Sequence, residues 1–335
     1  MGAPEGQFTG CPSSTCIFNQ FRERVQVQAQ QIVVLGTGGT IAGRAQRAAD
    51  ELGYRAGEIG VEQLLEGLPA LEGVTVVAEQ LAQIDSKDMA FELWRELAAR
   101  CRHWIEQPQV QGIVITHGTD TLEETAWFLH RVLAPRKPIV LVSAMRPATA
   151  LSPDGPQNLA EAFTVVRTAG ASGVLAVCAG AVHGAADVRK VHPYRVDAFS
   201  SGDAGALAYV EAGAVRHVRA WAATIPSHEL FDRLQRTAQW PWVEIVHSHA
   251  GADGRVVDAL ASAGVQGLVV AGTGNGSVHA ALEQALLRAR DAGVRVVRSS
   301  RCLEGPVIPL AKEALPCTPL TPAKARVDLL LDLLA

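Results

Sequence analysis

The chain has 335 residues, of which 48% are apolar and 19% are charged, and its formal net charge is -4. This length can bury the cores of about two domains, and the composition excludes an intrinsically disordered protein. The small negative charge excludes the basic surface typical of nucleic-acid binding. Two uncharged stretches, 168–186 and 259–282, are interrupted by glycines and polar residues, which favours buried strands and loops over membrane spans.

Residues 1–29 are polar, contain Gly and Pro, and lack the basic start and apolar core of a secretion signal, so we expect a flexible tail. The six cysteines show no C-x-x-C spacing, and Cys178 falls in an apolar run typical of a reduced core thiol. A disulfide between Cys11 and Cys16 stays open as an alternative. Without a recognisable export signal, the sequence predicts a cytoplasmic protein with reduced thiols.

Short apolar runs rich in Val and Ile alternate with helical patterns over the first two thirds of the chain. The predicted strands are 32–35, 74–78, 112–116, 139–143 and 174–177, and the predicted helices include 89–105, 122–133 and 158–168. Continuous rather than alternating apolar runs indicate strands buried on both faces. The predicted fold class is therefore α/β, with a mainly parallel sheet covered by helices in a larger N-terminal domain.

After Asp203 the pattern becomes less regular. A second alternation of apolar runs and helical patterns then follows. Its predicted elements are strands at 243–247, 268–271 and 294–298 and helices at 277–292 and 324–334. We therefore expect a smaller C-terminal α/β domain. The predicted division is a tail at 1–29, a catalytic α/β domain at 30–216, a linker at 217–240 and the smaller domain at 241–335.

Three similar Gly/Thr loops each follow a predicted strand: GTGGTIAG at 36–43, HGTDT at 117–121 and GTGNGS at 272–277. Ligands bind beyond the carboxyl ends of strands in open parallel sheets, and glycines there permit close backbone approach. The first loop lacks the Gly-Lys-Ser/Thr ending of a phosphate-binding loop and departs from G-x-G-x-x-G at Ile41. His117 and His183 lack metal-ligand spacing, so we expect no metal and no cofactor.

The HGTDT loop has two interpretations. Thr119, Asp120 or Thr121 could cap a helix at 122–133, whose first turn carries the acidic residues favoured there. Capping explains one of these residues but not the crowding of polar groups. A threonine hydroxyl is inert at neutral pH without a base, so catalysis requires a partner from elsewhere in the chain.

An ordered set of motifs runs from about Gln31 to the C-terminus: GTGGTIAG, IDSKDM (84–89), THGTDTLEET (116–125), VSAMRPATALSPDGPQNL (142–159), ADVRK (186–190), GTGNG and VRSSR (297–301). Together these motifs resemble the bacterial L-asparaginase/glutaminase family. The resemblance implies hydrolysis of L-asparagine to L-aspartate and ammonia through an acyl-threonine intermediate, with L-glutamine as a competing substrate. It also implies a homotetramer, a dimer of intimate dimers, with active sites at protomer boundaries.

The resemblance also implies roles for individual residues. Thr40 matches the nucleophile and Tyr54 the tyrosine that assists it. Thr119 corresponds to the second catalytic threonine, Lys190 to its paired lysine, and Asp120 to the carboxylate that holds the substrate ammonium. A buried lysine can lose its proton and become an acceptor for a hydroxyl proton.

The implied substrate-binding set adds Gly39, in the loop of Thr40, and residues from three further loops. Ser86 matches the residue that grips the α-carboxylate, Gly39 and Ala144 lie in matching loops, and Asn275 resembles an asparagine delivered by the neighbouring subunit. Without the family context, Lys190 is an ordinary solvated base, Tyr54 a loop anchor, and Ser86 a helix cap. Asn275 between two glycines is, on the same basis, a turn residue.

Two departures from the family pattern bear on the site. Lys87 stands where a neutral glutamine is usual, and its ammonium could grip the α-carboxylate or pair with Asp85. The segment 302–322 is shorter than expected where the family carries a glutamate that bonds the loop tyrosine. Glu304 and Glu313 are both candidates for that role.

Two alternative functions remain on the sequence alone. The amidase subunit of a tRNA-dependent amidotransferase resembles this family, but it would need an additional N-terminal domain. A catalytically silent amino-acid binder is the other, and the presence of Thr40, Thr119, Asp120 and Lys190 argues against it.

Overall fold

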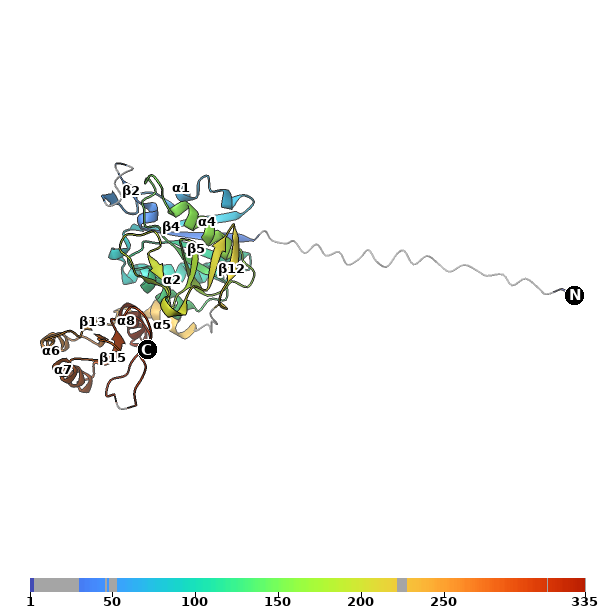
Figure 1. The fold of residues 1–335 in the computed structure, drawn as a ribbon. Coiled ribbons are helices and arrows are strands. Elements are labelled where there is room, and N and C mark those ends of the chain that lie inside the picture. Colours follow the sequence, from blue (N-terminus) through green and yellow to red (C-terminus); the bar gives the residue numbers. More distant parts are fainter. Residues whose placement is uncertain (3–29, 46, 48–52, 222–227, 312, 335) are drawn as a thin grey trace.

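The computed structural model describes residues 1–2, 30–45, 47, 53–221, 228–311 and 313–334. The predicted tail therefore lies almost wholly outside the described residues, and so do Cys11 and Cys16. A larger body, coloured blue to yellow in Figure 1, is followed by a smaller body coloured brown to red.

The larger body is built on an eight-stranded sheet in the order β12-β11-β8-β7-β6-β5-β1-β4. The strands are β1 Gln31–Gly38, β4 Thr75–Ile84, β5 Val110–Thr116, β6 Ile139–Val142, β7 Val174–Cys178, β8 Ala181–Gly184, β11 Ala208–Glu211 and β12 Ala214–His217. All pairs from β4 to β7 are parallel. The pairs from β7 to β12 are antiparallel, an edge that the apolar runs did not predict.

Helices cover both faces of this sheet, as the continuous apolar strands predicted. Alternate residues of β1 point to opposite sides. Val33 and Leu35 join the core under α2 (Phe91–Ile105) and α3 (Leu122–Leu133), whereas Ile32 and Val34 join the core under α4 (Gly155–Val166). The helices are α1 Val61–Leu65, α2 Phe91–Ile105, α3 Leu122–Leu133, α4 Gly155–Val166 and α5 His228–Arg236.

Short elements shape the loops around this sheet. They are the ribbons β2 Arg44–Ala45 with β3 Tyr54–Arg55 and β9 Arg189–Lys190 with β10 Phe199–Ser200, and the 3-10 turns η1 Thr40–Ala42, η2 Pro69–Leu71, η3 Ser86–Asp88 and η4 Gly202–Ala204. The helix expected at 158–168 begins earlier, at Gly155, because proline in the first turn favours helix initiation there. The helix expected from residue 89 begins at Phe91, after η3.

The smaller body has a three-stranded parallel sheet in the order β13-β14-β15. Its elements are β13 Val243–His247, α6 Arg255–Ser262, β14 Gly267–Gly272, α7 Ala280–Asp291, β15 Arg295–Ser300 and α8 Pro322–Asp332. A mainly parallel sheet in the larger body and a parallel sheet in the smaller body, both flanked by helices, confirm the α/β class. The segment 217–240, predicted as a linker, contains α5, whose Leu234 is fully buried.

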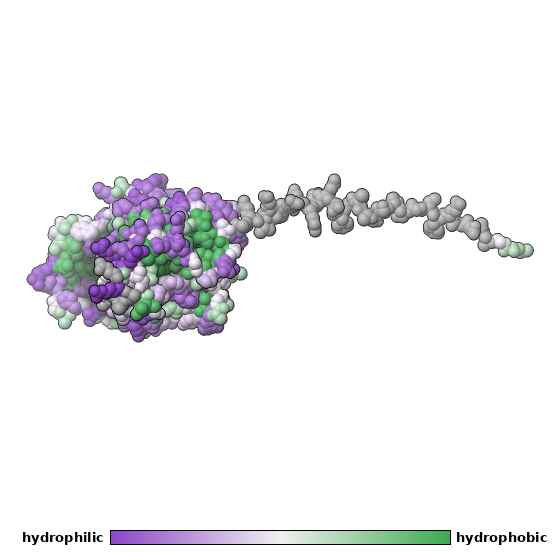
Figure 2. Space-filling model, turned by 90° about the horizontal axis from the view of Figure 1, so that it is seen from above, coloured by the Kyte–Doolittle hydropathy of each residue, from purple (hydrophilic) through white to green (hydrophobic). Residues whose placement is uncertain are grey.

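Helix α8 lies between the two bodies. It packs on the three-stranded sheet and also contacts α3, where the Trp127 indole donates to Asp328 at 3.1 Å and Arg131 donates to Asp332 at 2.9 Å. None of the helices in the described part of the chain has the length and hydropathy needed to span a bilayer. Figure 2 shows a face on which hydrophilic and apolar areas are interspersed.

Candidate active site

The candidate site lies at the carboxyl ends of β1 and β5. From β1 the chain passes to β4 at the sheet edge and then returns on the other side of β1 as β5. At such a reversal of strand order the two following loops separate and leave a crevice. The Thr37 hydroxyl joins the strand ends by donating to the carbonyl of Thr116 at 2.9 Å.

Glycines allow three loops to stack closely behind this crevice. A Cβ atom at Gly39, whose φ is +82°, would lie 2.4 Å from the Cα of Gly118. A Cβ atom at Gly118 would in turn lie 2.4 Å from the Ser86 Oγ. Because these two positions carry no side chain, Gly39 packs against the backbone of Gly118, and Gly118 packs against the Ser86 side chain.

Thr40 begins the short turn η1 and is only 6% exposed. Its Oγ lies 2.6 Å from the hydroxyl of Tyr54, which reaches it from the β2–β3 ribbon. The Gly57 N–H donates to the Gly39 carbonyl at 3.1 Å and ties this ribbon segment to the loop. Burial raises the pKa of Tyr54, so its phenol is protonated at neutral pH.

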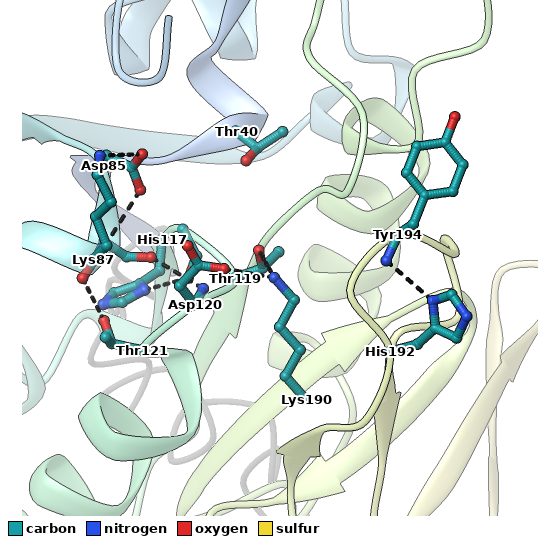
Figure 3. Close-up of polar contacts among 12 residues, drawn as sticks. Thr40, Asp85, Lys87, His117, Thr119, Asp120, Thr121, Lys190, His192 and Tyr194 are labelled. Carbon is teal, nitrogen blue, oxygen red and sulfur yellow. Dashed lines mark hydrogen bonds and ion pairs between the residues drawn. The ribbon is translucent and has the colours of Figure 1, made fainter. Parts of the chain in front are cut away.

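A second cluster joins residues that are far apart in the chain. The Lys190 ammonium donates to the Thr119 hydroxyl at 2.8 Å and to Asp120 Oδ1 at 2.6 Å. Figure 3 shows Lys190 reaching this pair from β9, with Thr40 on the opposite side of the space. The Lys190 side chain is 19% exposed and that of Asp120 is 50% exposed, so the carboxylate is the more accessible of the two to a ligand.

His117 holds the HGTDT loop in place through contacts of both its ring nitrogens. Its Nδ1 lies 2.7 Å from the Gly118 carbonyl and its Nε2 lies 2.9 Å from the Thr125 hydroxyl, which also accepts the indole N–H of Trp94. Burial lowers the pKa of His117 to about 4. The neutral ring thus donates from Nδ1 and accepts at Nε2, so it holds the loop and has no free nitrogen for a metal.

Helix capping does not explain the polar groups of the HGTDT loop. Thr121 is the N-cap of α3 but makes no side-chain cap bond, and its hydroxyl donates to the Ser86 carbonyl at 2.8 Å. The Ser86 hydroxyl oxygen accepts the backbone N–H of Asp120 at 3.1 Å. The hydroxyl hydrogen of Ser86 can still be donated to a ligand.

These groups surround a cavity of about 130 Å³. Its walls are formed by Thr40, Tyr54, Asp85, Thr119, Asp120, Met145, Lys190, Pro193 and Tyr194. The sequence analysis did not predict four of these as site residues, namely Asp85, Met145, Pro193 and Tyr194, and it named Asp85 only as a possible partner of Lys87. Pro193 and Tyr194 follow Lys190 closely, and the ring of His192 accepts the N–H groups of Tyr194 and Arg195 at 3.0 and 2.9 Å, a turn that no motif indicated.

Comparison with known proteins gives matches along nearly the whole chain. The family models "Asparaginase, N-terminal" and "Glutaminase/Asparaginase C-terminal domain" match residues 31–222 and 242–334. The L-asparaginase 2 of Bacillus subtilis is 35% identical over 97% of this chain and 92% of its own length. The chain belongs to the asparaginase family.

Two further matches are a glutaminase-asparaginase and a solved asparaginase structure. The glutaminase-asparaginase of Pseudomonas fluorescens is 39% identical over 82% of this chain and 76% of its own length. The crystal structure of a "probable cytoplasmic L-asparaginase" from Campylobacter jejuni superimposes with a TM-score of 0.82 at 38% identity, covering 91% of this chain and 95% of that one.

Five expected substrate-binding residues of this chain lie outside the cavity walls. Gly39 and Ser86 lie in the loops packed behind the cavity, and the other three are Lys87, Ala144 and Asn275. The Lys87 ammonium is exposed and pairs with Asp85 at 2.7 Å and with Asp88 at 3.3 Å, on the side of Figure 3 away from Lys190. Ala144 is buried next to Met145. Asn275 is exposed in the smaller body, where its amide exchanges hydrogen bonds of 2.9 and 2.7 Å with the backbone of Ile308.

Glu304 and Glu313 were the two candidates for the glutamate that bonds the loop tyrosine. Neither of them hydrogen-bonds Tyr54 within one copy of the chain. Glu313 pairs with the buried guanidinium of Arg298, with one contact at 2.9 Å. Glu304 is exposed in the loop after β15. In the part of the chain that the structure describes, no group of three His, Cys, Asp or Glu side chains could hold a metal ion.

Proposed function

We propose that this chain is an amidohydrolase that converts L-asparagine to L-aspartate and ammonia, with Thr40 as the nucleophile. One observation carries the proposal: two threonine hydroxyls, an ammonium and a carboxylate face a single small cavity. These are the groups needed to bind an amino-acid head group and to attack a carboxamide. Membership of the asparaginase family supports the same reaction.

The head group of the substrate would be held by opposite charges and hydroxyls. One oxygen of Asp120 bonds Lys190, which leaves the other for the α-ammonium. The Ser86 hydroxyl hydrogen is the proposed donor to the α-carboxylate. A substrate fixed at both charges presents its amide carbon in one orientation, and orientation of this kind lowers the barrier by several kcal/mol.

The proposed reaction has two steps. The Thr40 oxygen attacks the side-chain amide carbon, the C–N bond breaks, and ammonia leaves with the threonine proton, giving an acyl-threonine ester. Water then attacks the ester, which releases L-aspartate and returns the proton to Thr40. Both steps use only side chains and water.

The raised pKa of Tyr54 limits its role. A protonated phenol cannot serve as the base, so Tyr54 is proposed to orient the Thr40 hydroxyl and to relay its proton. The Thr119–Lys190 pair is the proposed acceptor and donor on the other wall.

A second copy of the chain is proposed to complete the site. Asn275 does not line the cavity of its own protomer, and the family resemblance assigns it to the neighbouring one. The loop after β15, which Asn275 anchors through Ile308, exposes the apolar side chains of Leu303, Ile308 and Leu310. Exposed apolar side chains gathered in one loop favour packing against another protein. The tetramer and the cytoplasmic location remain predictions.

Ammonia release from L-asparagine and L-glutamine tests the proposal. Wild type is expected to hydrolyse asparagine, and Thr40→Ala and Lys190→Met are each expected to lose at least about 100-fold in kcat. Thr119→Val is the matched test of the second hydroxyl, because the side chains have the same shape. Equal rates in wild type and Thr119→Val would remove that threonine from the mechanism.

Calorimetric titration with asparagine separates catalysis from binding. A wild type that binds asparagine and releases no ammonia from either amide is a silent binder, and the proposal is then wrong. The ratio of the two substrates is a separate result, since one methylene changes discrimination by only about 1–3 kcal/mol.

A further inference from the structure

Lys324 is a fully buried lysine in the first turn of α8, in the smaller body. Its ammonium donates to the carbonyl of Ala186 at 2.7 Å and to that of Val188 at 2.5 Å, both in the larger body. Burying an ammonium is unfavourable unless hydrogen bonds or charges compensate. Here the compensating acceptors are backbone groups more than 130 residues earlier in the chain.

The backbone held by Lys324 leads directly into the active site. Residues 185–188 connect β8 to β9, and β9 ends at Lys190. On the other side of Arg189, the backbone N–H of Lys190 lies near the carboxylate of Glu123, in the first turn of α3, and opposes the rise in the pKa of that carboxyl. The backbone just before Arg189 is therefore held by a buried ammonium that comes from the C-terminal helix.

We propose that Lys324 is a positioning residue for the reaction, which reaches across from α8 and fixes the strand that presents Lys190 to Thr119 and Asp120. This inference rests on the proposed function. It assigns to the C-terminal helix a part in catalysis although α8 contributes nothing to the cavity wall.

The electrostatics around Lys324 agree with this role. Burial lowers the pKa of Lys324 to about 8, while the nearby carboxylates of Glu123 and Asp187 oppose the shift. Burial likewise raises the pKa of Glu123, and Lys324 and the Lys190 N–H oppose that shift. Lys324 and Glu123 thus each stabilise the charged form of the other, and both lie close to the backbone that carries Lys190.

The test is Lys324→Met, which keeps an unbranched apolar stem and removes the ammonium. We expect kcat for asparagine to fall about 10- to 100-fold per folded molecule, because a misplacement near 1 Å has that effect. The KM should stay within about threefold, since Asp120 and Ser86 still hold the head group. Folded protein is quantified by circular dichroism and by urea unfolding.

Lys137→Met is the matched control. The Lys137 ammonium also donates to a backbone carbonyl, that of Gln107, at 2.7 Å. It precedes β6 and so lies at the amino edge of the sheet, opposite the catalytic loops. A loss of stability with unchanged kcat is expected for this variant.

A second variant covers the case in which Lys324→Met does not fold. Lys324→Gln retains one N–H donor group, and it should lose less kcat than the Met variant while keeping the same KM. A kcat equal to wild type in either folded variant, or a loss no larger than that of Lys137→Met, overturns the inference. Such an unchanged kcat overturns only the role of Lys324 when the wild type is active and Thr40→Ala is inactive. An inactive wild type overturns the proposed function as well.

Discussion

At the residue scale, Gly39 and Gly118 set how closely the catalytic loops approach. Gly39→Ala adds a Cβ that meets the backbone of Gly118 at 2.4 Å, and backbone atoms cannot move aside as a flexible side chain can. We expect this variant to lose about 1–3 kcal/mol of unfolding free energy beyond the cost of its positive φ. Its kcat should fall too, since Thr40 is the next residue.

Gly170→Ala supplies the control for the Gly39 prediction. Its φ is +77° and no heavy atom lies within 4 Å of the added Cβ. It should therefore show only the backbone strain, about 1–2 kcal/mol, with normal activity. Urea unfolding measures the loss of stability in both variants. An equal loss in Gly39→Ala and Gly170→Ala would contradict the prediction, because it would mean that the loops of Gly39 and Gly118 separate at little cost.

Lys87 offers a test between its two interpretations. Its exposed ammonium pairs with Asp85 and Asp88, a kind of surface ion pair that contributes little to stability. We therefore expect Lys87→Gln to change the KM for asparagine by less than about twofold and to leave the unfolding midpoint unchanged. Ser86→Ala is the positive control and should raise KM. A large rise in KM for Lys87→Gln would show that its ammonium grips the α-carboxylate.

At the element scale, two buried histidines tie strands to the elements that follow them. His117 joins the end of β5 to α3 and α2, and His183 in β8 lies 2.8 Å from the Ser201 hydroxyl. Burial lowers the pKa of each from 6.5 to about 4. Between these two pH values the unfolded chain binds more protons than the folded chain, so the free energy of unfolding should fall as pH is lowered through that window.

The slope of this acid effect is measurable. Each histidine contributes up to about 1.4 kcal/mol per pH unit, so His183→Asn should reduce the dependence by about that amount. Urea unfolding at several pH values from 7 to 4 gives the slope. His249→Asn, at an exposed histidine, is the control and should leave the slope as in wild type. An unchanged slope in His183→Asn would mean that His183 is accessible to protons in the folded state.

At the scale of the whole molecule, the shared site predicts complementation between two defective copies. Thr40→Ala and Asn275→Ala should each be nearly inactive alone. If each cavity uses Thr40 of one protomer and Asn275 of its partner, a mixed dimer contains one intact site. Random mixing makes half of the dimers mixed, so about a quarter of wild-type activity should return.

The mixture must be formed by co-expression or by refolding together, with light scattering to give the oligomer size. Wild type mixed with Thr40→Ala is the control for the assay, and it should keep half of the wild-type activity whether or not the copies exchange. Activity of the mixture no greater than the sum of the separate variants would mean that each protomer builds its site alone.

Sequence patterns predicted the central strands, which are buried along their whole length, and the helices that cover them. Runs such as 139–143 became central parallel strands, and α3 has the predicted bounds of Leu122–Leu133. The Gly/Thr motifs likewise predicted Thr40, Thr119 and Asp120 as members of one site, and all three line the cavity. The strands β8, β11 and β12 were missed because each has only four residues and two of them are partly exposed, so their apolar signal is weak.

The sequence by itself determined the fold class, the loops that carry hydroxyls and the residues that the motifs name, because these depend on the order of residues within short segments. Only the tertiary structure shows how distant groups meet. The family resemblance implied that Lys190 pairs with Thr119, and the two are in contact across 71 residues. The contact of Lys324 with Val188, across 136 residues, was not predicted. Such pairings follow from the order of strands in the sheet and from the docking of α8, which bring together residues that no local pattern connects.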